Sequence, residues 1–390
     1  MTVKPWLKLT PRWQPRTCSN IKTWIKAQPA SSGSLVCATV LEPQLFYLTL
    51  PSTVEPSIHP IFPKKKERRS PYRSPEQYIA RLHNVKLINS SGLLILPDGQ
   101  YATEPLTDQK YLAHMPECAS FVRRQLTKLK KVKKQGAYYS LLQIYCNGHN
   151  AYHWFHDVLQ NLYATLEHLP PDITYIVPEN LRQWQYESLK AIGIERSQTR
   201  PFQTGAVWEL ETLFFAPPVK GLGQDLPGLN EWLRAACYRE FNIHASKIER
   251  NQLIYISREQ ARGRKIANET DVMQFLQTKG FKRYFLEEMS LEQIVRLFAT
   301  AKVVVSPHGA GLTNLIFAQP QTKVIEIFEP TAKEIGACYW SLSAAMNHDY
   351  WYLLGDRVEN NQTPEQPNIK VPLDKLDKTL HQLNPLQISS

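Results

Sequence analysis

Histidines and an aspartate crowd one short segment near the middle of the chain, which ends in Asn-Ala-Tyr-His-Trp-Phe-His-Asp. Apolar residues then recur at steps of three and four, which predicts an amphipathic helix over 150–169. On such a helix Asn150, His153 and Asp157 share one face. An aspartate beside histidines at a helix start can take a proton from a hydroxyl group. The candidate catalytic residues are therefore His153, His156 and Asp157, and Asn150 is a candidate substrate-binding residue.

The same histidines allow two other interpretations. His149, His153 and His156 are spaced i, i+4 and i+7 and could ligate a metal, with Asp157 adjacent. The sequence has no HExxH motif and no evident distant ligand set, so we expect no metal. The remaining alternative is a group of helix-capping residues and ordinary surface histidines.

A glycine-containing turn forms a second group. The β-branched run Val303–Val305 leads into Ser-Pro-His-Gly-Ala-Gly-Leu-Thr-Asn and then into a helical pattern. A strand that passes through glycines into a helix presents N–H groups and the positive end of the helix dipole to an anion. The alternative is a tight turn in which glycine serves only the backbone. We expect a phosphate site made by His308, Gly309, Ala310, Gly311, Thr313 and Asn314.

Positive charges gather after another predicted strand, where Arg258, Arg262, Arg264 and Lys265 lie within eight residues. Such charges repel one another unless an anion neutralises them, and guanidinium groups can hold one phosphate through two N–H donors. We therefore expect this cluster, with Arg258 and Arg264 in it, to bind a diphosphate. A solvated basic loop is the alternative.

Glu326 is an acid within an otherwise apolar predicted strand, Val-Ile-Glu-Ile. Acids near such strand ends often accept hydrogen bonds from ribose hydroxyls. An ion pair at the strand end explains the residue equally well, so both interpretations stay open.

Alternating strands and helices must position these groups, and the pattern predicts two parallel sheets with ligands at the carboxyl ends of the strands. We expect three parts: a proline-rich irregular arm (1–75), an N-terminal lobe (76–220) and a C-terminal lobe (221–390). The N-terminal lobe opens with a β-meander over 85–103, and a linker is expected over 217–230. The expected strands are 137–145, 173–177, 208–215, 253–257, 281–286, 302–306 and 323–328. The expected helices are 150–169, 181–192, 231–241, 268–278, 291–300 and 312–318.

Composition limits the function classes. The chain has 390 residues, 43% of them hydrophobic and 21% charged, which is typical of globular proteins. The net charge of +11 favours anionic partners such as phosphorylated small molecules, acidic lipid or nucleic acid. The basic run at 64–69 could contact acidic lipid or nucleic acid, or could be a solvated loop. We expect the second run, 128–134, at a helix end or in a loop, and its lack of interleaved aromatic residues weakens the nucleic-acid interpretation.

Cysteine spacing and hydropathy suggest a location. No cysteine pair has CxxC spacing, and no uncharged apolar stretch reaches the ~18 residues of a membrane-spanning helix. We expect a cytoplasmic protein that the basic runs could dock to a membrane surface.

Three blocks of this sequence together resemble glycosyltransferase family 61. They are Asn150 to Asp157, Ser257 to Glu269, and Pro307 to Asn314 with the strand of Glu326, and they cover roughly residues 140–330 in the family's order. The resemblance implies a GT-B-like α/β fold, with two Rossmann-like lobes and a cleft between them.

The resemblance also implies a reaction. It is the inverting transfer of a hexosyl or pentosyl group from a nucleotide sugar, usually a UDP-sugar, to a hydroxyl of a glycan or lipid-linked glycan. Asp157 would be the base. Arg258, Arg264 and the 308–314 loop would hold the diphosphate, with no cofactor besides the donor. The alternatives are a basic nucleic-acid-binding protein and a GT-B-like scaffold that binds nucleotide without catalysis.

Overall fold

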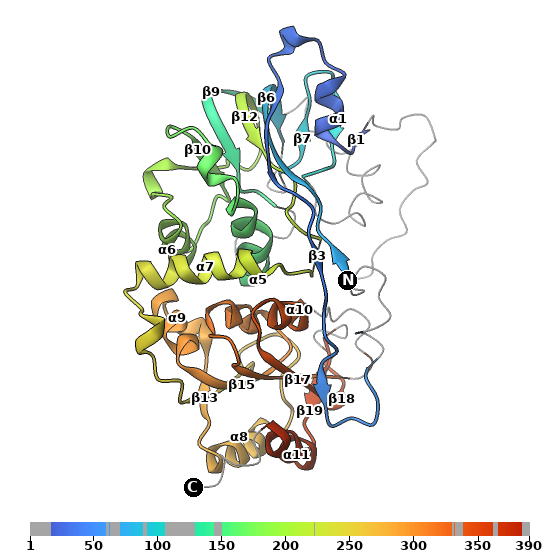
Figure 1. The fold of residues 1–390 in the computed structure, drawn as a ribbon, viewed down its shortest axis with the longest axis vertical. Helices are drawn as coiled ribbons and strands as arrows, with labels where there is room; N and C mark the ends of the chain where they lie inside the picture. Colours follow the sequence, from blue (N-terminus) through green and yellow to red (C-terminus); the bar gives the residue numbers. More distant parts are fainter. Residues whose placement is uncertain are drawn as a thin grey trace.

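Two large β-sheets, with a layer of helices between them, make up most of the described structure (Figure 1). Two small sheets are formed by β3 with β5 (Leu45–Phe46 and Tyr72–Arg73) and by β18 with β19 (Asp356–Val358 and Asn368–Lys370). A computed structural model describes residues 17–59, 62, 71–88, 92–105, 129–143, 150–221, 223–329, 331, 338–361 and 366–383. No helix in these ranges is long and apolar enough to cross a membrane.

The second sheet has six strands, and all of its neighbours are parallel. Without its short edge strand β4, the strands follow the spatial order 2-1-3-4-5 of a doubly wound sheet. The direction of winding changes between β13 and β15, and such a switch point opens a crevice at the carboxyl ends of the two strands. In spatial order the strands are β14 (Lys282–Tyr284), β13 (Gln252–Ile256), β15 (Ala301–Pro307), β16 (Lys323–Phe328), β17 (Asp349–Leu354) and β4 (Ser52–Thr53).

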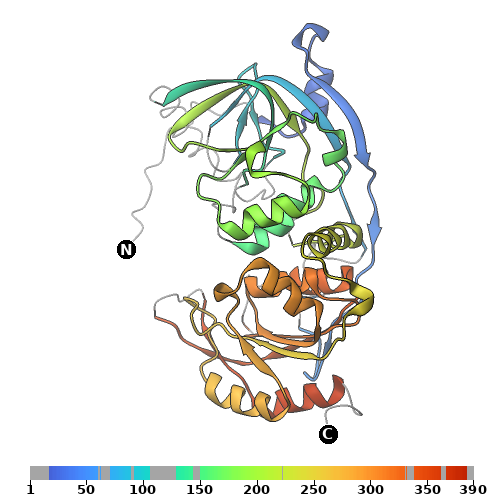
Figure 2. The same ribbon diagram turned by 90° about the vertical axis from the view of Figure 1, so that its left-hand side faces the viewer.

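Helices cover both faces of this sheet, which explains why its central strands are continuous apolar runs. One face carries α8 (Glu269–Thr278) and α11 (Leu373–Leu383) (Figures 1 and 2). The face toward the first sheet carries α7 (Pro227–Glu240), α9 (Leu291–Ala299), the 3-10 helix η9 (Ala310–Phe317) and α10 (Cys338–Ala345). The predicted strands at 253–257, 302–306 and 323–328 are confirmed to within one residue.

The first sheet has nine strands and is mixed. Its neighbours β12, β9, β10 and β11 are parallel, whereas β6 is antiparallel to β12. The meander predicted over 85–103 is confirmed, because β6, β7 and β8 pair antiparallel in turn. The strands are β1 (Thr17–Cys18), β8 (Tyr101–Ala102), β7 (Leu94–Ile95), β6 (Gln77–Leu87), β12 (Ala206–Phe215), β9 (Lys130–Ser140), β10 (Thr174–Val177) and β11 (Thr199–Pro201), with β2 (Leu35–Leu41) also on β6. Helix α6 (Gln183–Ala191) follows β10, as predicted.

The second basic run begins a strand, and its prediction as a helix end or loop was wrong. Lys130–Lys134 pair with Ala206–Leu210 of β12, whereas β10 pairs only with Tyr138–Ser140 of β9. The outer edge of β9 is therefore unpaired along its lysines among the described residues. Charged side chains on such an edge discourage pairing with another chain. The lysines hid the strand because lysine has a low strand propensity.

The helix predicted over 150–169 is not a regular α-helix. It consists of α5 (Ala151–His153), a π-helical turn η3 (Trp154–Leu159) and the 3-10 segments η4 (Gln160–Leu162) and η5 (Leu166–His168). Every residue of η3 is buried, so this turn does not have the exposed polar face of an amphipathic helix. Such π-turns are uncommon and occur frequently at functional sites.

The connection between the sheets is shorter and less exposed than predicted. Helix α7 begins at Pro227, so the predicted linker 217–230 overlaps its first turn; proline suits that position because its missing N–H would be unpaired there anyway. Before the helix, Val219, Lys220 and Asp225 are all buried. This connection is therefore part of the packed structure.

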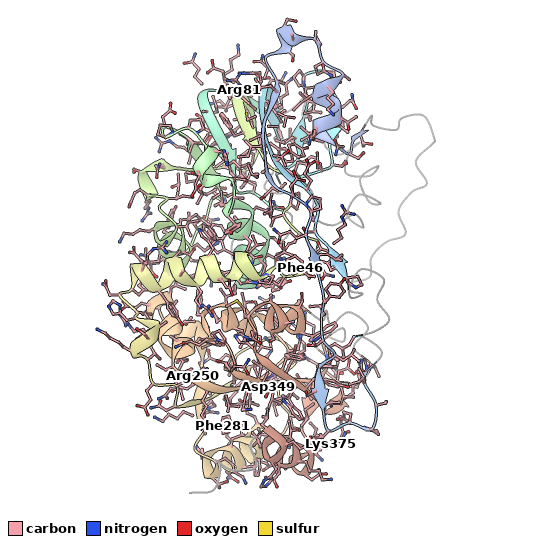
Figure 3. All side chains as sticks on the ribbon, viewed as in Figure 1. Phe46, Arg81, Arg250, Phe281, Asp349 and Lys375 are labelled. Carbon is pink, nitrogen blue, oxygen red and sulfur yellow. The ribbon has the colours of Figure 1, made fainter. Side chains whose placement is uncertain are left out.

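Residues 17–59, which precede β5 (Tyr72–Arg73), run along one side of both sheets (Figures 1 and 2). This segment contains α1 (Ile21–Lys26), β2 in the first sheet, β3 (Leu45–Phe46) on β5, and β4 in the second sheet. Phe46 marks its midpoint between the sheets (Figure 3). The prediction of an irregular arm was therefore wrong for these strands. The prolines around them made the segment look irregular, although its apolar residues form strands. The basic run 64–69 lies outside the described residues.

Candidate active site

His153 and Asp157 form a close pair at the start of the helical segment that follows β9. His153 Nδ1 lies 2.6 Å from Asp157 Oδ2, and the two side chains are 17% and 5% exposed. Asn150 begins the helix, because its Oδ1 accepts a hydrogen bond from the Tyr152 N–H at 3.0 Å. An ionised carboxylate only accepts hydrogen bonds, so the proton of this contact is on His153 Nδ1.

His156 points to a different carboxylate and is completely buried. Its Nδ1 lies 2.8 Å from Asp225 Oδ1, and neither side chain is exposed. It therefore does not reach a substrate in this structure, although its residue type and spacing made it a catalytic candidate. Sequence reasoning missed Asp225 because it lies in the segment that was interpreted as a linker.

Arg258 and Arg264 lie close together after β13. Burial and the neighbouring Arg264 lower the pKa of Arg258 to about 10. Burial also lowers the pKa of Arg264, whose backbone is left-handed with φ of 57°. The Nε atom of each is buried and has no hydrogen-bond partner, and neither guanidinium forms an ion pair with a described carboxylate. Two neighbouring cations that form no ion pair among the described residues are an anion-binding arrangement.

Gly309 makes room for Arg258. A Cβ at residue 309 would lie 2.7 Å from Arg258 Cζ and would overlap the guanidinium nitrogens. The φ of Gly309 is 168°, extended backbone that any residue can adopt. The glycine is therefore required for space rather than for conformation, and it lets the guanidinium lie directly on the loop.

The rest of the loop divides into an inner and an outer part. Thr313 is completely buried, and Asn314 donates its Nδ2 to the Gly311 carbonyl at 3.0 Å, so these two side chains face the protein. Ala310 and Gly311 are partly exposed at the start of η9. The first N–H groups of a helix have no partner within it, so the backbone there offers donors to an anion.

His308 and Glu326 are paired within the core. His308 Nδ1 contacts Glu326 Oε1, and the Tyr350 hydroxyl donates to Glu326 Oε2. Burial lowers the pKa of His308, and the charges of Arg264 and Arg258 act in the same direction. One oxygen of Glu326 thus lies against His308, and the other accepts the Tyr350 hydroxyl.

A pocket lies at the switch point of the second sheet, beside these groups. Its empty volume is about 320 Å³, and both β13 and β15 contribute their carboxyl ends to it. It is lined by Ile256, Ser257, Arg258, Ala261, Leu286, Glu287, Ser306, Pro307 and Gly311.

Aromatic rings connect the two groups of candidates. Tyr152 stacks on His156 with centroids 4.5 Å apart, and its edge meets Tyr339 at 5.9 Å. Tyr339 in turn lies 5.3 Å from the His308 ring. The π-turn that carries Asp157 is therefore connected through Tyr152 and Tyr339 to His308, the neighbour of Gly309.

The described residues contain no cluster of histidine, cysteine and acidic side chains that could hold a metal ion. His153 and His156 engage different carboxylates, and His149 lies outside the described residues.

Comparison with known families decides the class of protein. Residues 151–325 match the model of the family Glycosyltransferase 61. This segment belongs to glycosyltransferase family 61. A search of the curated proteins found no match. The resemblance drawn from the sequence blocks is confirmed.

The family 61 segment contains most of the site. It begins one residue after Asn150, runs through the His153–Asp157 pair and both arginines, and ends one residue before Glu326. Asp225 also lies within it. The family implies that the protein transfers a sugar from a donor to an acceptor.

Proposed function

We propose that this glycosyltransferase moves a hexosyl or pentosyl group, with inversion, from a nucleotide-sugar diphosphate to a hydroxyl of a glycan or lipid-linked glycan. The observation that carries the donor class is the pair Arg258 and Arg264. Their buried Nε atoms have no partner, and their pKa values are lowered, so the fold holds two cations together at a thermodynamic cost. The resemblance favours UDP among the nucleotides.

The donor diphosphate is assigned to the arginines and the start of η9. Guanidinium groups and backbone N–H groups at a helix start both suit a diphosphate, and together they neutralise the charge that develops on the leaving group. The adjoining pocket at the ends of β13 and β15 is assigned to the donor as well. The arginines supply the positive charge, so the proposal needs no resident metal.

The acceptor proton is assigned to the His153–Asp157 pair. The carboxylate holds Nδ1–H, which leaves Nε2, on the opposite side of the ring, as the atom that takes the proton. This reverses the roles implied by the family resemblance: Asp157 orients His153, and His153 is the base.

The proposed reaction is a single displacement at the anomeric carbon of the donor sugar. The acceptor hydroxyl gives its proton to His153 Nε2 while its oxygen forms a bond to the anomeric carbon. The bond from that carbon to the diphosphate oxygen breaks, and the leaving diphosphate takes the electron pair. Attack from the opposite face inverts the anomeric centre. A GT-B-like arrangement, with the acceptor on the first-sheet side, is the architecture that we propose for this reaction.

A thermal-shift screen tests the donor. The protein is heated with UDP, GDP, CMP and their sugars, and the screen is repeated with Arg264→Ala and with the exposed control Arg250→Ala. A ligand that binds only the folded form raises the melting temperature when supplied well above its dissociation constant. We expect a rise with one nucleotide class that Arg264→Ala abolishes and Arg250→Ala retains. A melting temperature that no nucleotide raises would reject the donor site.

A further inference from the structure

Asp225 is a buried carboxylate at the centre of a polar network that the reaction does not use directly. Its Oδ1 receives His156 Nδ1 at 2.8 Å and Asn230 Nδ2 at 3.1 Å, and Lys220 Nζ lies 3.9 Å away. Burial alone would raise the pKa of Asp225, but the charges of His156 and Lys220 and the hydrogen bonds from His156 and Asn230 lower it. Asp225 is therefore ionised inside the protein.

The network reaches the base through His156. This histidine precedes Asp157 in the π-helical turn and follows His153 by three residues. Its ring is fixed on one side by Asp225 and on a face by Tyr152. Because the turn is short and packed, a change in the position of the His156 ring moves Asp157 with it.

The network also reaches the arginine site. The Asp225 N–H donates to Ser341 Oγ at 2.9 Å, which ties the connection between the sheets to α10. The same helix carries Tyr339, whose ring lies against His308. Asp225 thus contacts both the segment that holds the base and the helix beside the arginine site.

The network is not arranged for stability alone. His156 Nε2 and Asp225 Oδ2 are both buried and have no hydrogen-bond partner among the described residues. Unpaired buried polar atoms cost free energy, and a buried ion pair is often no more stable than apolar residues of similar volume. A buried network that costs free energy is more typical of a functional requirement than of a contribution to stability.

We propose that Asp225 is a positioning residue: acting through His156, it holds the His153–Asp157 pair in place relative to the arginine site. The inference rests on the proposed function, in which that pair removes the acceptor proton. Asp225 touches no substrate in this scheme. It controls the distance between the base and the donor.

The test compares Asp225→Ala, Asp225→Asn and Ser341→Ala with Glu104→Ala. Glu104 is a matched control, because it is a carboxylate that accepts hydrogen bonds from Tyr78 and from a backbone N–H, far from the site. Each variant is assayed below its melting temperature for kcat and for the dissociation constant of UDP. Asparagine keeps the oxygen that receives His156 Nδ1, so Asp225→Asn should retain kcat within about threefold of the unmodified enzyme.

Asp225→Ala should lower kcat on the order of 10²-fold and leave UDP affinity unchanged, because small misplacements of a reacting group have effects of this size. Ser341→Ala, which keeps the His156 contact, should lower kcat by less, about tenfold. Glu104→Ala should lower the melting temperature and leave kcat unchanged. If Asp225→Ala behaves like Glu104→Ala, Asp225 is only structural and the inference is overturned.

A second measurement separates this inference from the proposed function. Nitrogen-15 spectra of labelled histidine report ring protonation without any substrate. We expect Asp225→Ala to move the ring signals of both His156 and His153, whereas Asp225→Asn leaves His153 in place. An unmoved His153 signal in Asp225→Ala overturns the inference even if the donor is not a nucleotide sugar. An enzyme that turns over no nucleotide sugar, but shows the His153 change, contradicts only the proposed function.

Discussion

The guanidinium of Arg258 rests on the backbone of Gly309, in the space that any side chain at that position would fill. The loop after β15 and the loop after β13 are thereby fitted to each other, and the switch point of the second sheet is lined by a cation on one side and helix N–H groups on the other.

Replacing Gly309 with alanine should weaken nucleotide binding by about 10- to 100-fold, the range for losing a hydrogen bond to a charged group. The new methyl group displaces the Arg258 guanidinium, whereas the extended backbone accepts alanine without strain. Titration calorimetry with UDP measures the change. Gly228→Ala is the matched control, because a Cβ there meets nothing closer than 3.5 Å. Equal affinity in both variants would show that Arg258 does not hold the nucleotide.

Replacing Arg258 with methionine should abolish the response to nucleotide and stabilise the protein without ligand. The pKa of Arg258 in the folded protein, about 10, is below the ordinary value of arginine, so the fold disfavours the charged form. This cost is fully present below pH 10 and diminishes as the pH rises from 10 toward the ordinary pKa of arginine. Denaturant unfolding of the two proteins at pH 7 to 9 should give a constant difference in the free energy of unfolding. A methionine variant that is less stable than the unmodified protein in the absence of ligand would contradict this account.

His153→Ala and Asp157→Asn should each lower kcat about 10²- to 10⁴-fold, and the double variant should be no worse than the more damaging single one. The two residues act as one unit, so their effects do not add. Steady-state kinetics with the donor identified by the thermal screen gives the comparison. If His153→Ala retains most of the activity while Asp157→Asn loses it, then the carboxylate itself takes the proton.

Protein stability should fall on acidification below pH 6.5, with a contribution from His348. Burial lowers the pKa of His348 to about 3, so the unfolded chain takes up its proton first. The stability contributed by the neutral ring is present above pH 6.5 and is lost as the pH falls toward 3. Unfolding curves from pH 7 to 4 should be flatter for His348→Gln than for the unmodified protein. Parallel curves would mean that another buried group dominates this range.

The sequence was sufficient to predict a structural element wherever its local pattern agrees with the way the element packs. The strand Val303–Val305 and its glycine loop were found because a buried parallel strand needs an apolar run, and a turn into a helix needs small residues. The arginine cluster was found from charge density alone. These features require no knowledge of which distant residues meet.

The partners of charged residues could not be found in the same way. Asp225 looked like a linker residue until folding placed it against His156, 69 positions away in sequence. The partners of Glu326 were missed as well, because His308 and Tyr350 lie 18 and 24 positions away in sequence. The π-turn was missed because periodicity predicts an amphipathic helix, and a segment buried on all sides has no polar face to reveal its true winding.

The N-terminal segment has a consequence for the order of folding. Thr53 donates to the Tyr352 carbonyl across 299 positions of sequence, and β4 can pair only after β17 has been made. On the ribosome, β4 must therefore wait until the chain has grown by the 299 positions that separate Thr53 from Tyr352. Contacts of such long range slow folding, and unpaired strands are prone to aggregate while they wait. The prolines around β4 limit that hazard, because proline cannot donate to a β-ladder.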